Sequence, residues 1–485
     1  MTVLKELVGF LLTKKVLVTG KTLAILKQKD EEVQQELFES LKHASDDEIK
    51  KIISCIGEES QNTESRGTVS IVYSCAIKEA RTTLADFVSY FNARYKYIEK
   101  ILRNRQELQN VTSIRRVSQK DEKEHVAVIG IVKKIVETKN NNIIVIVEDP
   151  TGEINLLISK NKKEVFDAVR LLVLDEIIGV VGVSGKGIIF VDKILYPDIP
   201  IYNELKKAPK EEYALFLSDM HVGSKQFLGQ SFEKFLKWMN GEIGDEKQRK
   251  LVKKIKYVFI MGDIVDGVGI YPGQEKDLEL ADIYEQYAEA ARLLSRIPKH
   301  MQMIICPGNH DAVRMAEPQM PFFEDIAKPL YDLPNVIMVS NPSWVSIGVQ
   351  EGFPGITVLL YHGYSFDYYI ANVDDIRNNG GYDRADLVMK FLLQKRHLAP
   401  THASCLYIPY PEHDPLIISK VPDIFATGHL HKTSVSTYRN VTLICGSCWQ
   451  GKTAFQEKVG HNPEPGRVPI VNLQTRELKI LRFGE

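Results

Sequence analysis

The sequence has few cysteines, no long apolar run and almost no net charge. Its six cysteines are scattered over 485 residues, at positions 55, 75, 306, 405, 445 and 448. So few thiols argue against a disulfide framework and for a reducing compartment. The apolar runs are far shorter than a membrane span, and the N-terminus lacks the pattern of a signal peptide. We therefore expect an intracellular, cytoplasmic protein with no membrane segment.

The charge balance limits how the chain can meet nucleic acid. A formal net charge of -1 excludes a global basic field that would draw the whole chain onto a phosphate backbone. Any contact with nucleic acid must then come from a local patch or from a partner protein. At 485 residues the chain is long enough for two or three domains, each with a core of its own.

One stretch presents three polar side chains at the end of an apolar run. Met303–Ile305 leads into Cys306-Pro307-Gly308-Asn309-His310-Asp311, a pattern that predicts a buried strand followed by a tight turn. Pro307 fixes one backbone dihedral and Gly308 permits a sharp bend. An amide, an imidazole and a carboxylate should therefore leave the strand end together.

Four further apolar runs end in the same way. The polar residues that follow them are Asp219 with His221, Asp263 with Asp266 just beyond, His362, and His429 with His431. In open α/β sheets, ligands bind just outside the carboxyl ends of the strands. We therefore expect five strand ends to converge on one shallow site rich in His, Asp and Asn.

This set of side chains predicts a metal centre. Mixed nitrogen and oxygen ligands suit Mn²⁺, Fe or Zn²⁺ better than Mg²⁺ or Ca²⁺, and the absence of cysteine disfavours a structural zinc site. There are more groups than one ion needs, so we expect two divalent ions about 3.5–4 Å apart, a pair suited to phosphoester hydrolysis. Seven other histidines do not follow predicted strands and are interpreted as structural or solvated: His43, His125, His300, His397, His402, His413 and His461.

The rest of the chain predicts a series of units with different periodicity. Residues 1–56 show helical spacing, and either their own core or docking to another protein explains them. Residues 57–81 are interpreted as a linker and 82–123 as a connecting helix. Five strand patterns around one short helix predict an OB-type β-barrel at 124–204. Its strands carry few aromatics, so a subunit interface stays open beside binding of single-stranded nucleic acid. Residues 205–485 form the α/β domain that carries the five strand ends.

Two local motifs do not fit the functions that they usually mark. Gly446–Thr453 matches the Walker A pattern, but no full helix follows it and no acidic strand end accompanies it, so we do not expect ATP binding. Cys445-x-x-Cys448 lacks two further zinc ligands and a thioredoxin-like context. It is interpreted as two small, partly buried residues.

The ordered motifs resemble the signature of the calcineurin-like metallophosphoesterases, whose fold is a β-sandwich flanked by helices. They are Asp219-x-His221, Gly262-Asp263, Gly308-Asn309-His310-Asp311, His362 and Gly428-His429-x-His431. The resemblance implies a first ion bound by Asp219, His221 and His431. It implies a second ion bound by Asn309, His362 and His429, with Asp263 bridging both. It also implies that His310 stabilises the transition state or protonates the leaving oxygen, with Asp311 placed to orient it.

The order of helical module, barrel and phosphoesterase is similar to that of the small (B) subunits of replicative DNA polymerases. Residues 87–103, 396–400, 422–425 and Trp449-Gln450 resemble the small subunit of archaeal D-family DNA polymerase. This implies a 3′→5′ proofreading exonuclease that acts on single-stranded or mismatched DNA 3′ ends, with Mn²⁺ as the expected metal, in a heterodimer with a large polymerase subunit. Two alternatives stay open: a catalytically idle scaffold for a polymerase subunit, and a phosphatase of small molecules or proteins.

Overall fold

The computed structural model describes most of the chain beyond its N-terminal region. The described residues are 10–11, 13–14, 38–39, 41–42, 49, 65–66, 68–75, 82–119, 123–453, 456–457 and 461–484. The chain divides into two compact units, Met1–Tyr73 and Ser74–Glu485. The predicted helical module at 1–56 and most of the predicted linker at 57–81 lie outside the described residues. Near the end of the first unit, β1 (Ser65–Arg66) pairs with β2 (Val69–Ser74) in antiparallel register.

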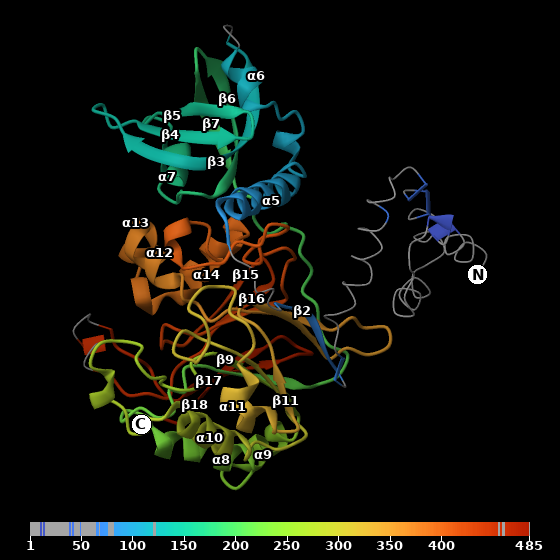
Figure 1. Ribbon diagram of the computed structural model, residues 1–485, viewed down its shortest axis with the longest axis vertical. Helices are drawn as coiled ribbons and strands as arrows, with labels where there is room; N and C mark the ends of the chain where they lie inside the picture. Colours follow the sequence, from blue (N-terminus) through green and yellow to red (C-terminus); the bar gives the residue numbers. More distant parts are fainter. Residues whose placement is uncertain are drawn as a thin grey trace. The chain divides into compact units, whose positions relative to one another are not determined.

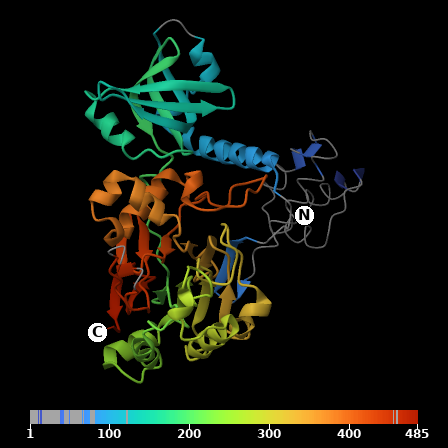
Figure 2. The ribbon, with the colours of Figure 1, turned by 60° about the vertical axis from the view of Figure 1, so that its left-hand side comes forward.

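The second unit begins with helix α5 (Leu84–Leu102), which lies along the barrel in Figure 2. A capping box between Thr83 and Asp86 fixes its start. Its buried face, which includes Tyr95 and Ile98, packs on barrel residues. The helix ends at Leu102 and a short 3₁₀ helix, η2 (Gln106–Leu108), follows. The segment at 82–123 is therefore not one continuous helix, because the chain turns to place Leu108 against Gly179 of the barrel.

The barrel is closed and has the strand order β3-β4-β5-β7-β6 (Figure 1). Its strands are β3 (His125–Glu137), β4 (Ile143–Asp149), β5 (Gly152–Ile158), β6 (Ile177–Gly185) and β7 (Ile188–Leu195). Helix α6 (Ile114–Ser118) precedes it, and α7 (Lys163–Val169) lies between β5 and β6 in sequence. In β5 the burial alternates because successive side chains point to opposite faces, and Ile154, Leu156 and Ile158 enter the core.

Two sheets follow the barrel in the chain. The first has the order β11-β10-β9-β8-β17-β18, and β8 to β11 are parallel. Its strands are β8 (Tyr213–Leu217), β9 (Ile255–Met261), β10 (Gln302–Cys306), β11 (Val336–Met338), β17 (Arg467–Asn472) and β18 (Leu478–Arg482). The helices between them are α8 (Gly229–Met239), α9 (Glu246–Val252), α10 (Ile283–Leu294) and α11 (Glu324–Tyr331).

In the second sheet β12, β13, β14, β16 and β15 neighbour one another in that order, and β13, β14 and β16 are parallel. Its strands are β12 (Ser343–Ile347), β13 (Ile356–Leu360), β14 (Ile424–Thr427), β15 (Ser434–Tyr438) and β16 (Val441–Cys445). Helices α12 (Phe366–Asn372), α13 (Asp374–Asn378) and α14 (Ala385–Lys395) lie between β13 and β14 in sequence.

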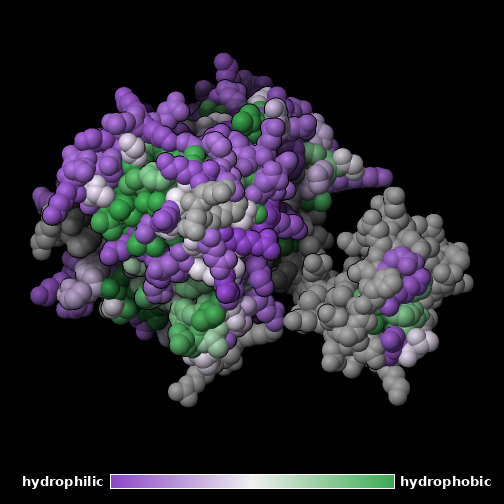
Figure 3. All heavy atoms as spheres, turned by 90° about the horizontal axis from the view of Figure 1, so that it is seen from above, coloured by the Kyte–Doolittle hydropathy of each residue, from purple (hydrophilic) through white to green (hydrophobic). Residues whose placement is uncertain are grey.

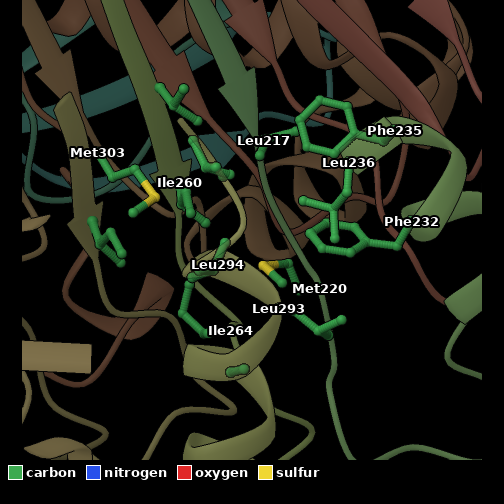
Figure 4. Close-up of a cluster of buried hydrophobic side chains, with 14 of the residues drawn as sticks. Leu217, Met220, Phe232, Phe235, Leu236, Ile260, Ile264, Leu293, Leu294 and Met303 are labelled. Carbon is green, nitrogen blue, oxygen red and sulfur yellow. The ribbon is translucent and has the colours of Figure 1, made fainter. Parts of the chain in front are cut away.

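The main core lies between the first sheet and its helices. Side chains of alternate strand residues, including Leu217, Ile260 and Met303, meet Phe235 and Leu294 from α8 and α10 (Figure 4). The intervening residues of β8 and β9 point to the opposite face, where Phe216 and Phe259 stack with their ring centroids 5.0 Å apart. Both faces are buried, which explains why these strands are continuous apolar runs in the sequence.

The predicted fold class is confirmed for the described residues: a phosphoesterase-like β-sandwich flanked by helices, preceded by a β-barrel. The domain limits at 124–204 and 205–485 stay predictions. In the described part of the chain, no helix has both the length and the apolar character needed to cross a membrane. The face of the molecule seen in Figure 3 is mostly hydrophilic, with smaller hydrophobic areas between the charged side chains.

Candidate metal centre

The two sheets bring the five predicted strand ends to one cavity of about 350 Å³. β8, β9 and β10 belong to the first sheet, whereas β13 and β14 belong to the second. The parallel strands of each sheet carry their polar residues at the same edge, and the sandwich places the two edges together. Convergence of the strand ends therefore depends on two sheets rather than on one.

The first cluster of possible metal ligands consists of Asp219, His221 and His431. Nε2 of His221 lies 3.1 Å from Nε2 of His431. Oδ1 of Asp219 lies 3.4 Å from the His431 nitrogen and 4.0 Å from the His221 nitrogen. All three side chains are buried. Two imidazole nitrogens and a carboxylate that point at one small space are a donor set suited to a divalent cation.

The second cluster consists of Asp263, His362 and His429. Nε2 of His362 lies 3.3 Å from Oδ2 of Asp263 and 2.9 Å from Oδ1 of Asn309. The same Asp263 oxygen lies 3.8 Å from Nε2 of His221 in the first cluster. Asp263 therefore lies between the clusters, and all seven predicted ligands meet at one site.

The histidines are held by their other ring nitrogens, as metal-binding histidines usually are. Nδ1 of His221 lies 3.0 Å from Oδ1 of Asp266, and Nδ1 of His362 lies 2.7 Å from the carbonyl oxygen of Met261. His429 has the opposite orientation, since its Nε2 lies 2.9 Å from Oδ2 of Asp367. Each ring thus turns its remaining nitrogen toward the centre. The donor set fits divalent cations in number, type and support.

Charges in the centre are strongly coupled. Burial would raise the pKa of Asp263, but His362 and His310 outweigh it and hold that pKa well below its ordinary value. Burial would lower the pKa of His362, but Asp263 and Asp219 outweigh it and raise the pKa to about 10. The carboxylates are therefore ionised in the folded chain and draw positive charge into the site.

The backbone at this site takes a conformation that is rare for side chains other than glycine. The φ angles of Asp219, His221, Asp263, His429 and His431 are 51°, 52°, 52°, 70° and 54°. Each such residue costs on the order of 1–3 kcal/mol, and clusters of them mark functional sites. Gly308 meets a different constraint, because a Cβ there would lie 2.2 Å from Oδ1 of Asp263. The surrounding fold must hold these ligands in place.

The structure corrects the prediction for Asp311. Nδ1 of His310 lies 2.8 Å from the backbone carbonyl oxygen of Asp266, which orients the ring. The Asp311 carboxylate instead accepts backbone hydrogen bonds from Gly308 at 2.9 Å and Ile264 at 3.1 Å. The prediction that Asp311 orients His310 is therefore wrong: the tight turn leaves backbone N–H groups that need a buried acceptor. Burial and the nearby Asp263 raise the pKa of Asp311 to about 7.

Sequence reasoning missed several residues at the cavity wall. Asp266 follows β9 and was noted without a role, and Asp367 comes from α12. His461 was interpreted as structural or solvated, whereas it lines the cavity with Tyr382. Only the position of Asp266 beyond a strand end could have indicated its role. Nothing local marks the other three residues.

The Walker-like stretch belongs to the same wall. The backbone N–H of Trp449 donates to the carbonyl oxygen of Asp219 at 2.9 Å, and Nε2 of Gln450 donates to Oδ1 of Asp266 at 2.9 Å. β16 is thus a sixth strand whose end reaches the site. Cys445 and Cys448 are fully buried rather than partly buried.

Comparisons with known proteins relate the chain to polymerase subunits. The family model of the small (B) subunits of DNA polymerases alpha and epsilon matches residues 214–436. The DNA polymerase II small subunit of Methanothermobacter thermautotrophicus is 38% identical over 401 residues, which cover 83% of this chain and 80% of that protein. That of Pyrococcus furiosus is 38% identical over 411 residues, covering 84% of this chain and 65% of the relative. A solved archaeal phosphodiesterase is 12% identical, with a TM-score of 0.28, and the match covers 56% of this chain and 99% of that one.

Proposed function

The chain belongs to the family of archaeal DNA polymerase II small subunits, and from this premise we propose that it is the 3′→5′ exonuclease subunit of a replicative D-family DNA polymerase. It would remove single-stranded or mismatched 3′ ends in the cytoplasm, as the partner of a large polymerase subunit. The bond broken would join phosphorus to the 3′ oxygen of the preceding nucleotide. Water would supply the new oxygen on phosphorus.

The observation that supports hydrolysis most strongly is the position of Asp263 between two clusters of ligands. Its Oδ2 lies 3.3 Å from Nε2 of His362 and 3.8 Å from Nε2 of His221. We infer two divalent ions, with Mn²⁺ favoured by the mixed nitrogen and oxygen donors. Divalent ions bound there would lower the pKa of a water molecule and neutralise phosphate oxygens.

The proton on the leaving side is assigned to His310. Its Nδ1 is engaged by the Asp266 carbonyl oxygen at 2.8 Å, and its ring lines the cavity. Nε2 is then the ring nitrogen that can donate a proton to the leaving 3′ oxygen or stabilise the anionic transition state. The backbone N–H of His310 donates to Oδ1 of Asp263 at 2.8 Å, which fixes the residue beside the ligands.

The test compares His310→Ala with wild type in the complex with the large subunit. With Mn²⁺ and a 5′-labelled oligonucleotide that has a mismatched 3′ end, wild type should shorten the end, and His310→Ala should be slower by about 10²- to 10⁴-fold. Elemental analysis should show that the variant retains its metal. His300→Ala is the matched control, because His300 lies outside the cavity lining.

Equal rates for wild type and His310→Ala would rule out the nuclease proposal. Retention of no stoichiometric metal after dialysis would then favour the idle scaffold. Faster turnover of a chromogenic phosphomonoester than of any oligonucleotide would favour a phosphatase instead.

A further inference from the structure

A second cavity adjoins the metal centre. Its volume is about 340 Å³, and its lining includes Ile370, Ala371, Arg377, Tyr382, His461 and Asn462. Tyr382 and His461 also line the cavity of the metal centre. The two cavities therefore share a wall made of two aromatic rings, and a volume of this size suits a small ligand group.

The shared wall is fixed at both ends. The Tyr382 and His461 ring centroids lie 5.2 Å apart at an interplanar angle of 74°. The Tyr382 hydroxyl donates to the Asp367 carboxylate, which lies 2.9 Å from Nε2 of the predicted ligand His429. Tyr382 is thus tied to the metal centre through two successive contacts. The residue still remains 38% exposed.

The backbone places this tyrosine at the cavity by an unusual turn. Tyr382 lies in the 3₁₀ helix η4 (Gly381–Asp383), and Gly380 and Gly381 before it have φ angles of 122° and 54°. A Cβ at Gly380 would lie 2.6 Å from Cγ of Arg384. The turn therefore needs glycine, and it presents an aromatic ring at the cavity rim.

The companion ring is suited to stacking as a neutral group. Burial, with nearby His431 and Lys432, lowers the pKa of His461 to about 4. Nδ1 of His461 is buried and makes no hydrogen bond to any residue that the structure describes. A polar ring edge of this kind can bond a ligand that enters the second cavity.

From this geometry we propose that the second cavity is a nucleobase subsite, in which Tyr382 and His461 stack on the unpaired base next to the scissile phosphate. The proposal rests on the nuclease function proposed above and adds a substrate class to it: single-stranded or frayed DNA whose terminal bases are unpaired. Stacking suits an exonuclease because every base offers a π-face, so that binding tolerates any sequence.

The first test measures binding without cleavage. The full chain carrying His310→Ala is mixed with Mn²⁺ and a single-stranded oligonucleotide with 2-aminopurine at its 3′ end. Stacking on Tyr382 should quench the 2-aminopurine fluorescence. Tyr382→Ala should abolish the quenching, whereas Tyr382→Phe, which keeps the ring, should preserve it. Tyr284→Ala is the matched control, since Tyr284 is 56% exposed and lines neither cavity.

The second test uses the complex with the large subunit and two oligonucleotides, one with normal bases and one with abasic residues at the 3′ end. Stacking contributes about 1–3 kcal/mol per base, which corresponds to a preference for the normal end of about 5- to 150-fold in kcat/KM. Tyr382→Ala should bring this ratio close to one. Tyr284→Ala should keep the wild-type ratio.

The outcomes separate this proposal from the nuclease function. If fluorescence is quenched but wild type digests no DNA, the subsite stands and the nuclease proposal fails. If wild type digests both ends equally, or if Tyr382→Ala leaves the ratio or the quenching unchanged, the subsite proposal is overturned. An absence of quenching with the wild-type ring present overturns it as well.

Discussion

Asp266 supports two functional histidines, and its replacement by Asn tests the inferred metal centre most sharply. Its Oδ1 lies 3.0 Å from Nδ1 of His221 and 2.9 Å from Nε2 of Gln450, and its Oδ2 lies 3.2 Å from Nε2 of Gln274. Its backbone carbonyl oxygen orients His310 and is kept in Asp266→Asn. The substitution therefore perturbs the support of a ligand and spares that of the proton donor.

The magnitude follows from the number of acceptors. Three donors converge on two carboxylate oxygens, and Asn offers only one oxygen. If that oxygen faces His221, the new NH₂ group meets the amide of Gln274; if the side chain is flipped, the bond to His221 is lost. The negative charge that raises the basicity of the His221 ring is lost in either case. Loss of such a support weakens metal binding by about 10- to 100-fold, or about 1.4–2.7 kcal/mol.

The assay is titration of the dialysed full chain with Mn²⁺ by calorimetry, with metal content measured separately. The matched control is Asp282→Asn, because Asp282 is the N-cap of α10 and Asn caps a helix equally well. Asp266→Asn should bind Mn²⁺ at least tenfold more weakly than the control and unfold at a similar temperature. If the two variants bind Mn²⁺ equally, His221 is not a ligand that depends on Asp266, and the assignment of the first cluster fails.

Two further predictions concern the buried polar cluster that joins α5 to the phosphoesterase domain. Asp414→Asn should destabilise the chain by about 3–5 kcal/mol, because Nε of buried Arg94 lies 2.6 Å from Asp414 Oδ2 and would lose its counter-charge. Thermal unfolding would show this loss, and Asp332→Asn, at an exposed pair with Lys328, should cost less than about 1 kcal/mol. His397 should make the fold acid-sensitive: burial and Arg94 outweigh Asp414 and lower its pKa to about 4, and its Nδ1 accepts the Ala399 N–H at 2.9 Å. Since the unfolded pKa is about 6.5, its contribution is complete above about pH 6.5 and is lost as the pH falls toward 4; His397→Gln should flatten the unfolding temperature over this range, and an unchanged slope would contradict the assignment.

Local periodicity explains how much of the fold was predictable. The apolar runs at 257–261 and 303–305 lie in strands β9 and β10, and the predicted helix at 163–169 is α7. Such patterns depend on neighbours in sequence, because burial on both faces of a strand requires an uninterrupted apolar run. The turn after Leu102, in contrast, depends on where Leu108 meets Gly179, a contact that no short window reveals.

For the centre, the sequence by itself determined which side chains stand at strand ends, and hence that an imidazole and carboxylate site was to be expected. Tertiary structure alone decided that the five ends come from two sheets, that Asp311 binds backbone rather than His310, and that Tyr382 and His461 form a wall. The physical reason is distance along the chain. His221 and His431 are 210 residues apart, yet their Nε2 atoms lie 3.1 Å from each other, and only the packing of the whole sandwich can impose such a contact.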